Sequence, residues 1–252
     1  MKAQKTIKIL PLFILLLSFF SCKTETPQKT AITVLIDVTD ERFKDSNFVS
    51  ENLPKFLRLM KLNKETGGFS GGEIKLSLIN EVSDSKSKTI KIDVGETGMM
   101  GENPLNRKDE VERFYNELEQ SFSSIIEKAD WGTNASKIYQ KVTRECIKMN
   151  KTEADRKYLL IYSDMLENSS QFSFYGQNWK KRIEKMMEEP EKTIELLAQK
   201  GPALPDLSTF DIYIIATRTS GNDEKINLSE QFWTTLFEYQ GASVTFGSGL
   251  EI

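Results

Sequence analysis

Histidine is absent from all 252 residues of the chain. Its absence excludes Ser-His-Asp and Cys-His catalysis, imidazole general bases and zinc sites with histidine ligands. Any bound metal would have to be held by oxygen atoms, which favours magnesium, calcium or manganese. Strongly basic stretches are also missing, so nucleic acid is not an expected partner.

The first 21 residues have the composition of an export signal. Three lysines and no acid are followed by an apolar run from residue 9 to residue 20. This run is shorter than the roughly 20 residues that span a bilayer, and a small residue ends it, as in secretory signals. The sequence Phe19-Phe20-Ser21-Cys22 resembles the lipobox of bacterial lipoproteins, in the loose form typical of the Bacteroidota. A smaller aliphatic residue usually stands where Phe19 is.

This resemblance implies a signal peptide over residues 1–21, a lipid anchor on Cys22 and a polar tether over residues 22–30. Several acyl chains would give lasting attachment, because each buried methylene contributes about 0.8 kcal/mol. We expect the cell membrane of the envelope, with the outer membrane favoured and the periplasmic and surface faces both open. Without the signal, the chain has 31 basic and 37 acidic residues, a formal net charge of −6.

Cysteine is scarce, with only Cys22 and Cys146 in the chain. An acylated Cys22 leaves Cys146 as the only thiol, so no intramolecular disulfide is expected. The apolar residues Ile138 and Ile147 are near Cys146 in the sequence. This setting favours a core position over a reactive thiol.

Apolar β-branched runs and amphipathic helices alternate along residues 31–252, which we predict to be one domain. The alternation predicts an α/β fold with a Rossmann-like, doubly wound and mostly parallel sheet, one antiparallel edge strand and flanking helices. A helical excursion is expected over about residues 165–208. The predicted strands cover residues 31–37, 73–80, 89–94, 158–163, 210–217 and 242–246. The predicted helices cover residues 48–62, 107–127, 134–149 and 228–239, with two more around Pro190.

Two of the buried strands end in an aspartate, Asp37 in LIDVTDE and Asp164 in IYSDMLE. Thr39 follows the first strand, and Thr133 in WGTNASKIY precedes a predicted helix. Because the carboxyl ends of parallel strands share one edge of a doubly wound sheet, we expect these four side chains to converge. Two carboxylates and two hydroxyls suit a hard divalent cation.

These residues resemble the metal-ion-dependent adhesion site (MIDAS) of the von Willebrand factor A (vWA) domain family. The family pattern is Asp-x-Ser-x-Ser after the first strand, a threonine in a later loop and an aspartate after the fourth strand. Asp37, Thr39, Thr133 and Asp164 match it, and the order of elements matches over roughly residues 31–248. Glu41 stands in place of the second serine, where it either contributes to the site or abolishes it.

The resemblance implies a non-enzymatic module that binds an acidic side chain of a protein partner through Mg²⁺, with Mn²⁺ or Ca²⁺ as alternatives. Asp40 and the aromatic residues Phe172, Phe174 and Tyr175 are candidate partner contacts near the same edge. Packing of the aromatic residues inside the domain is the other interpretation.

Two further functional interpretations stay open. The first is a magnesium-dependent phosphohydrolase-like enzyme. The haloacid dehalogenase pattern requires a second aspartate where Thr39 stands, which argues against this interpretation. The second is a degenerate domain that binds no metal and has a structural role.

Overall fold

The computed structural model of the chain describes residues 26–45, 47–80, 87–97, 101–132, 136–216 and 223–251. The strands are β1 (Lys29–Asp37), β2 (Gly71–Ile79), β3 (Ser87–Ile92), β4 (Arg156–Tyr162), β5 (Phe210–Ile215) and β6 (Ser243–Gly247). They form one sheet in the order β3-β2-β1-β4-β5-β6. β3 is antiparallel to β2, and the other neighbouring strands pair in parallel. The predicted mostly parallel sheet with one antiparallel edge strand is confirmed.

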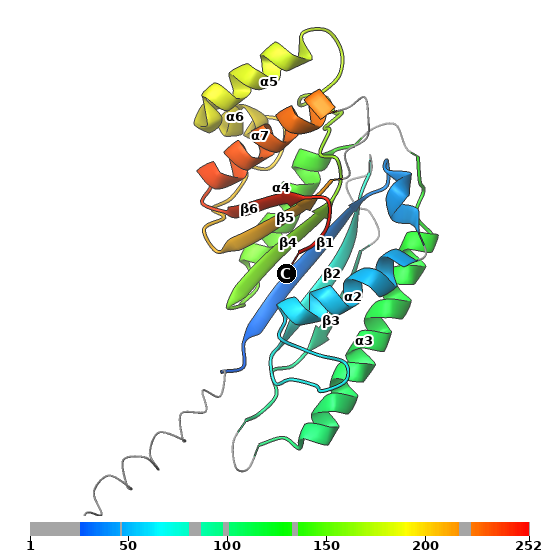
Figure 1. Cartoon of the computed structure of the whole chain (residues 1–252). Coiled ribbons are helices and arrows are strands. Elements are labelled where there is room, and N and C mark those ends of the chain that lie inside the picture. Colours follow the sequence, from blue (N-terminus) through cyan, green and yellow to red (C-terminus); the bar gives the residue numbers. More distant parts are fainter. Residues whose placement is uncertain are drawn as a thin grey trace, which may run out of the picture.

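Helices cover both faces of this sheet (Figure 1). They are α2 (Asn47–Leu59), α3 (Pro104–Glu127), α4 (Ile138–Asn150), α5 (Trp179–Glu188), α6 (Pro190–Ala198) and α7 (Asp223–Tyr239). α2 and α3 form an apolar cluster with β1, β2 and β3 on one face. α4 and α7 form a second cluster on the other face, and α5 and α6 pack against α7. A short 3-10 helix, η2 (Glu41–Lys44), follows β1 and was not predicted.

The central strand β1 is buried on both faces from its second residue to its end. Its alternate side chains enter the two apolar clusters, with Val34 on the α2–α3 side and Leu35 on the α4–α7 side. This double burial explains the uninterrupted apolar run in the sequence. β2 instead alternates, because Ile74 enters the α2–α3 cluster whereas Glu73 and Lys75 point to the other side.

The segment between β4 and β5 forms the predicted helical excursion. Two of the candidate partner contacts in this segment prove to be buried. Phe172 and Phe174 pack against Phe232 of α7, with ring centroids 5.1 Å and 5.8 Å apart. They are only 5% and 0% exposed, so they are core residues and do not form a partner surface. Aromatic rings gain most from such burial when they can pack on other rings. Tyr175 alone of the three remains 42% exposed.

Helix α3 is fastened near its start by the buried side chain of Arg107. The guanidinium donates hydrogen bonds to the carbonyls of Gly68 (2.8 Å), Ser70 (2.7 Å) and Asp93 (2.7 Å). These carbonyls belong to the segments that precede β2 and follow β3. One cation therefore holds both segments against α3 and satisfies backbone oxygens that would otherwise be costly to bury.

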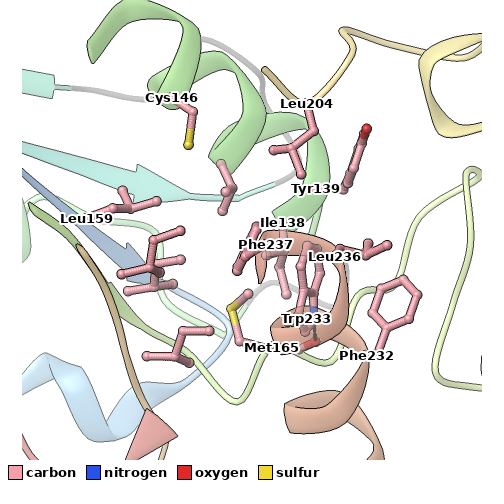
Figure 2. Packing of buried hydrophobic residues seen from close by; sticks show 14 of the residues in the cluster. Ile138, Tyr139, Cys146, Leu159, Met165, Leu204, Phe232, Trp233, Leu236 and Phe237 are labelled. Atoms are coloured by element: carbon pink, nitrogen blue, oxygen red, sulfur yellow. Dashed lines mark hydrogen bonds between the residues drawn. The ribbon is translucent and has the colours of Figure 1, made fainter. Parts of the chain in front are cut away.

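Cys146 lies in the α4–α7 cluster and is 0% exposed, which confirms the predicted core position (Figure 2). Burial raises the pKa of its thiol, so the reactive thiolate is disfavoured. Cys22 lies outside the described residues. None of the helices in the described ranges is both long enough and apolar enough to cross a membrane.

Gly72 in β2 supplies a steric test of the β1–β2 pairing. It pairs with Thr30 and has φ +136°, and a Cβ at this position would lie 1.8 Å from the Thr30 carbonyl oxygen. Gly72→Ala is expected to lower the free energy of unfolding by about 3 kcal/mol or more, because the two strands must separate. Urea denaturation measures the change.

Gly176→Ala is the matched control. Gly176 also has a positive φ, +83°, but a Cβ there would meet no heavy atom of the described residues within 4 Å. Only the left-handed strain of about 1 kcal/mol remains. Equal losses of stability in the two variants would contradict the steric explanation.

Candidate functional site

The carboxylate of Asp37 is the centre of the candidate site. Asp37 ends β1 and is 1% exposed. Its Oδ1 accepts hydrogen bonds from the Thr39 amide (3.0 Å) and hydroxyl (2.8 Å), and its Oδ2 accepts from the hydroxyls of Ser136 (3.0 Å) and Ser163 (2.8 Å). Burial raises the pKa of Asp37, and these hydrogen bonds oppose the rise. One buried carboxylate thus joins the ends of β1 and β4 to the segment before α4.

The turn after β1 brings two more acids and a cation to the same edge of the sheet. Asp40 caps η2 and pairs with Arg42, whose Nε lies 2.6 Å from Asp40 Oδ1 and whose guanidinium also reaches Oδ2. Glu41 is exposed, and its Oε1 lies 3.1 Å from the position of a Cβ on Gly132. Thr133, the next residue in the sequence, lies outside the described residues, so its expected place in the site remains a prediction.

Asp164 follows β4 and lies close enough to these acids to respond to their charge. Burial raises the pKa of Asp164 to about 6; Asp37 and Asp40 add to the rise, while Arg42 opposes it. Oδ1 accepts a hydrogen bond from the Leu166 amide (3.0 Å). Across the part of the chain that the structure describes, Oδ2 has no hydrogen-bond partner. Asp164 is therefore a half-buried acid with one oxygen to offer to a ligand.

The backbone after Asp164 is held in an uncommon conformation. Met165 has φ +60°, a left-handed value that side chains other than glycine rarely adopt. Its amide donates to Ser163 Oγ (2.9 Å), and its carbonyl accepts from Ser229 Oγ (3.0 Å) and Trp233 Nε1 (2.8 Å). Figure 2 shows Met165 beside Trp233. These bonds to Ser163, directly after β4, and to α7 hold the strained residue, and with it the adjacent Asp164, at the edge.

Glu167 is a buried acid that the sequence interpretation missed. It is 0% exposed, and its Oε2 accepts a hydrogen bond from the Tyr139 amide (2.8 Å) in the first turn of α4. Its Oε1 is buried without a hydrogen-bond partner among the described residues. Burial raises the pKa of Glu167 to about 7. Glu167 thus caps α4 from across the fold; its only signal in the sequence is its position three residues after Asp164.

The donor atoms at this edge suit a hard cation. Within the described ranges, no group of three acidic or cysteine side chains is close enough to hold a metal ion, so hydroxyl oxygens would have to take part. The Thr39 hydroxyl donates its proton to Asp37, which leaves its lone pairs for another partner. Together with Asp37 and Asp164, it offers the oxygen ligands that Mg²⁺ and Ca²⁺ prefer.

An aromatic pair with a cation borders the acidic edge. The pKa of Tyr175 is raised by burial, with additions from the charges of Asp164 and Asp37. The Nζ atom of Lys225 lies 4.3 Å from the ring centroid of Tyr175 and 5.7 Å from that of Trp179. Tyr175 is therefore placed beside the site, as predicted from its position in the sequence after Asp164.

Most of the predicted site residues lie at one edge of the sheet. The site residues that were not predicted are mainly their hydrogen-bond and ion-pair partners. Serines and a glutamate that approach from other segments carry no distinctive spacing, so the sequence did not single them out. The residues brought together as predicted are Asp37, Thr39, Asp40, Asp164 and Tyr175, and Glu41 lies beside Gly132. The residues that the prediction missed are Arg42, Ser136, Ser163 and Glu167.

No protein-family model matches the chain, and no curated protein matches it in sequence. Similar solved structures include the vWF domain of the type V pili tip protein Mfa5 from Porphyromonas gingivalis, with 10% identity, a TM-score of 0.41 and coverage of 88% of this chain and 90% of that chain. Another is the D319A mutant of the PilB minor pilin from Streptococcus sanguinis, with 10% identity and a TM-score of 0.46. The match covers 90% of this chain and 58% of that chain.

The human COPII-coat protein Sec24c is also similar, with 12% identity, a TM-score of 0.43 and coverage of 90% of this chain and 31% of that chain. The chain thus spans about a third of Sec24c and under two thirds of PilB. At these identities and TM-scores the similarity concerns the fold alone, and the site rests on the residues described above.

Glu167→Gln is expected to weaken the pH dependence of stability. The folded-state pKa of Glu167, about 7, is above its ordinary value of 4.5, so the folded state binds more protons between these values than the unfolded state. Stability therefore falls as the pH rises from about 4.5 to about 7, and the substitution removes up to about 3 kcal/mol of this fall. Urea denaturation at several pH values across this range measures it.

The glutamine amide oxygen can still accept the hydrogen bond from Tyr139, so the cap of α4 is kept. Glu112→Gln, on the exposed side of α3, is the control and should leave the pH profile unchanged. A wild-type profile in Glu167→Gln would mean that Glu167 does not bind a proton in the folded state.

Proposed function

We propose that this protein is a binding module whose acidic edge engages a protein partner through a divalent cation. Asp37, Thr39 and Asp164 are the proposed ligands, with Thr133 and Glu41 as further candidates. A bound cation would supply an open coordination position for an acidic side chain of the partner. Mg²⁺ is the expected ion, with Mn²⁺ or Ca²⁺ as alternatives.

The excess of negative charge among the described residues of the acidic edge is the observation that carries this proposal. Asp37 and Asp164 are both held where burial raises their pKa. Asp40 adds a third carboxylate, and Arg42 contributes one guanidinium to the group. The pKa of Asp164 is raised mainly by burial and further by the charges of Asp37 and Asp40. A divalent cation would stabilise the ionised carboxylates against both effects.

Side chains around the edge support partner contact. Tyr175 is 42% exposed beside Trp179 and Lys225, and Glu41 is exposed on η2. Aromatic residues are enriched among the side chains that contribute most to binding at interfaces. In this proposal they supply contact area, while the cation supplies specificity for an acidic group.

We further propose that the domain acts while anchored to a bacterial membrane through lipid on Cys22. The signal-like composition of residues 1–21 and the lipobox-like Phe19-Phe20-Ser21-Cys22 support this anchor. The seven tether residues 23–29 span at most about 25 Å, so the domain would stay close to its membrane. The outer membrane is favoured, and either of its faces fits the tether.

Thermal unfolding with and without a divalent cation tests the cation site. Adding Mg²⁺ or Mn²⁺ to EDTA-treated protein is expected to raise the melting temperature, because a ligand at 100 times its Kd stabilises the native state by about 2.7 kcal/mol. Asp164→Asn is expected to abolish the rise, since the amide keeps an acceptor for Leu166 but loses the charge.

Asp155→Asn is the matched control for this measurement. Asp155 also accepts one backbone hydrogen bond, from the Lys29 amide (2.8 Å), but at the opposite end of β1. Its variant should respond to the cation as the unaltered protein does. A melting temperature that no cation changes, or an equal rise in Asp164→Asn, would contradict the proposed site.

Arg42→Gln distinguishes a cation-binding site from one that is already neutralised. The substitution is expected to tighten Mn²⁺ binding about tenfold, because it removes a positive charge near the acids and releases Asp40. Titration calorimetry measures the affinity, with Lys44→Gln at the end of the same short helix as control. Absence of Mn²⁺ binding together with a lower melting temperature in Arg42→Gln would favour a structural domain without metal.

Cys22→Ala tests the anchor independently of the cation. The variant is expected to leave the membrane fraction and to lose incorporation of labelled lipid, because no other residue of the lipobox-like segment can carry the thioether. Membrane fractionation and lipid labelling measure both effects. Unchanged results would show that Cys22 does not anchor the protein.

A further inference from the structure

A polar groove lies on the α4 side of the sheet, away from the acidic edge. It encloses a cavity of about 200 Å³ between the β2–β3 pair and the second half of α4. Glu73 and Lys75 line it from β2, and Thr89 and Lys91 line it from β3. On the side of the sheet that faces α4, β2 and β3 thus carry polar side chains here, whereas the central strands carry core residues.

Buried Glu145 forms one wall of this groove and is surrounded by three lysines. Its side chain is 1% exposed, with Oε2 at 2.5 Å from Lys75 Nζ. Its Oε1 lies 3.2 Å from Lys148 Nζ and 3.4 Å from Lys141 Nζ. Each ammonium carries three N–H donors and a full charge. The Glu145 carboxylate therefore offsets only part of the charge of Lys75 and Lys148, the two of these lysines that line the groove.

A second ion pair completes the groove. Lys91 Nζ lies 2.9 Å from Glu73 Oε2, and the Thr152 hydroxyl donates to Glu73 Oε1 (3.3 Å). Among the described residues that line the groove, three ammonium groups (Lys75, Lys91 and Lys148) therefore face two carboxylates (Glu73 and Glu145). Burial lowers the pKa of Lys141; Glu145 opposes this effect, and the neighbouring lysines add to it. The cluster holds more positive charge than its own acids offset.

We propose that this groove binds a small oxyanion of the phosphate class. Oxygen atoms of the anion would accept charge-assisted hydrogen bonds from Lys75, Lys91 and Lys148. The volume of about 200 Å³ suits a single phosphate group and is below the roughly 300–1,000 Å³ of sites for larger ligands. The proposal does not depend on a cation at the acidic edge.

The phosphate group has two possible sources, free phosphate and a phospholipid headgroup. A second cavity, of about 580 Å³, shares Glu73, Lys91 and Thr152 with the groove and reaches Lys29 at the start of β1. Lys29 belongs to the proposed tether, so lipid phosphates would be close to this side of an anchored domain. Both sources present the same oxyanion chemistry.

Titration calorimetry of the full chain with inorganic phosphate tests the groove, against sodium chloride of equal ionic strength. Saturable binding of phosphate alone is expected. Lys91→Gln and Lys148→Gln should each weaken it at least about fivefold, since each removes one charge-assisted donor. Their side chains are 71% and 62% exposed, so neither substitution should prevent folding.

Lys192→Gln is the matched control. Its side chain is also 71% exposed, and it makes a one-to-one pair with Glu189 at 2.8 Å, far from the groove in a different helix. It should bind phosphate as the unaltered protein does. Unchanged phosphate affinity in both groove variants would overturn the proposal.

Glu145→Gln separates an anion site from a purely structural cluster. If the lysines bind an external anion, removing their internal competitor should tighten phosphate binding about tenfold. If they serve only to neutralise Glu145, the variant should show no tighter binding, which would count against the proposal. The two lysine variants keep the test decisive should Glu145→Gln fail to fold.

The soluble headgroup glycerophosphoglycerol distinguishes the two sources of phosphate. Binding of inorganic phosphate without this diester assigns the groove to free phosphate. Binding of the diester assigns it to a lipid headgroup. Binding of neither compound overturns the proposal.

Discussion

The buried carboxylate of Asp37 is the interaction on which the acidic edge depends. A charge with 1% exposure is costly to bury unless donors surround it, and here four hydrogen bonds from three residues do so. The donors come from the turn after β1, the segment before α4 and the end of β4. The hydrogen bonds to this one carboxylate therefore fix three loops relative to each other. Asp164 is positioned in the same way, because the preceding residue, Ser163, is one of the donors.

The fold could be predicted because its signals are local and periodic. The uninterrupted apolar run of β1 reflects burial on two faces, and the alternation in β2 reflects one apolar and one polar face. Element ends were less predictable: α7 begins at Asp223, five residues before the prediction, because its first turn is polar. The short helix η2 was missed because capping by Asp40 and pairing with Arg42 leave no periodic signal.

The site could be predicted only in part, for a physical reason. Asp37 and Asp164 were identified because parallel strands bring their carboxyl ends to one edge. Glu167 was missed because its role as a cap of α4 depends on a contact across the fold. Phe172 was a candidate partner contact, yet it packs on Phe232, which lies 60 residues away in the sequence. Long-range partners decide whether a polar or aromatic side chain is a ligand or a part of the core.

Helix α4 connects the two charged regions of the molecule. Its first turn lies at the acidic edge, where Glu167 accepts the Tyr139 amide, and its later turns carry Glu145 and Lys148 at the groove. A helix dipole favours negative charge at its first turn and positive charge at its last. The acids of the edge therefore lie near the start of α4, and the lysines of the groove lie near its end, where the dipole stabilises each group. The dipole of α4 thus helps to keep acids at the edge and lysines at the groove. A cation bound at the edge would offset the negative charge there, and an anion bound in the groove would offset the positive charge.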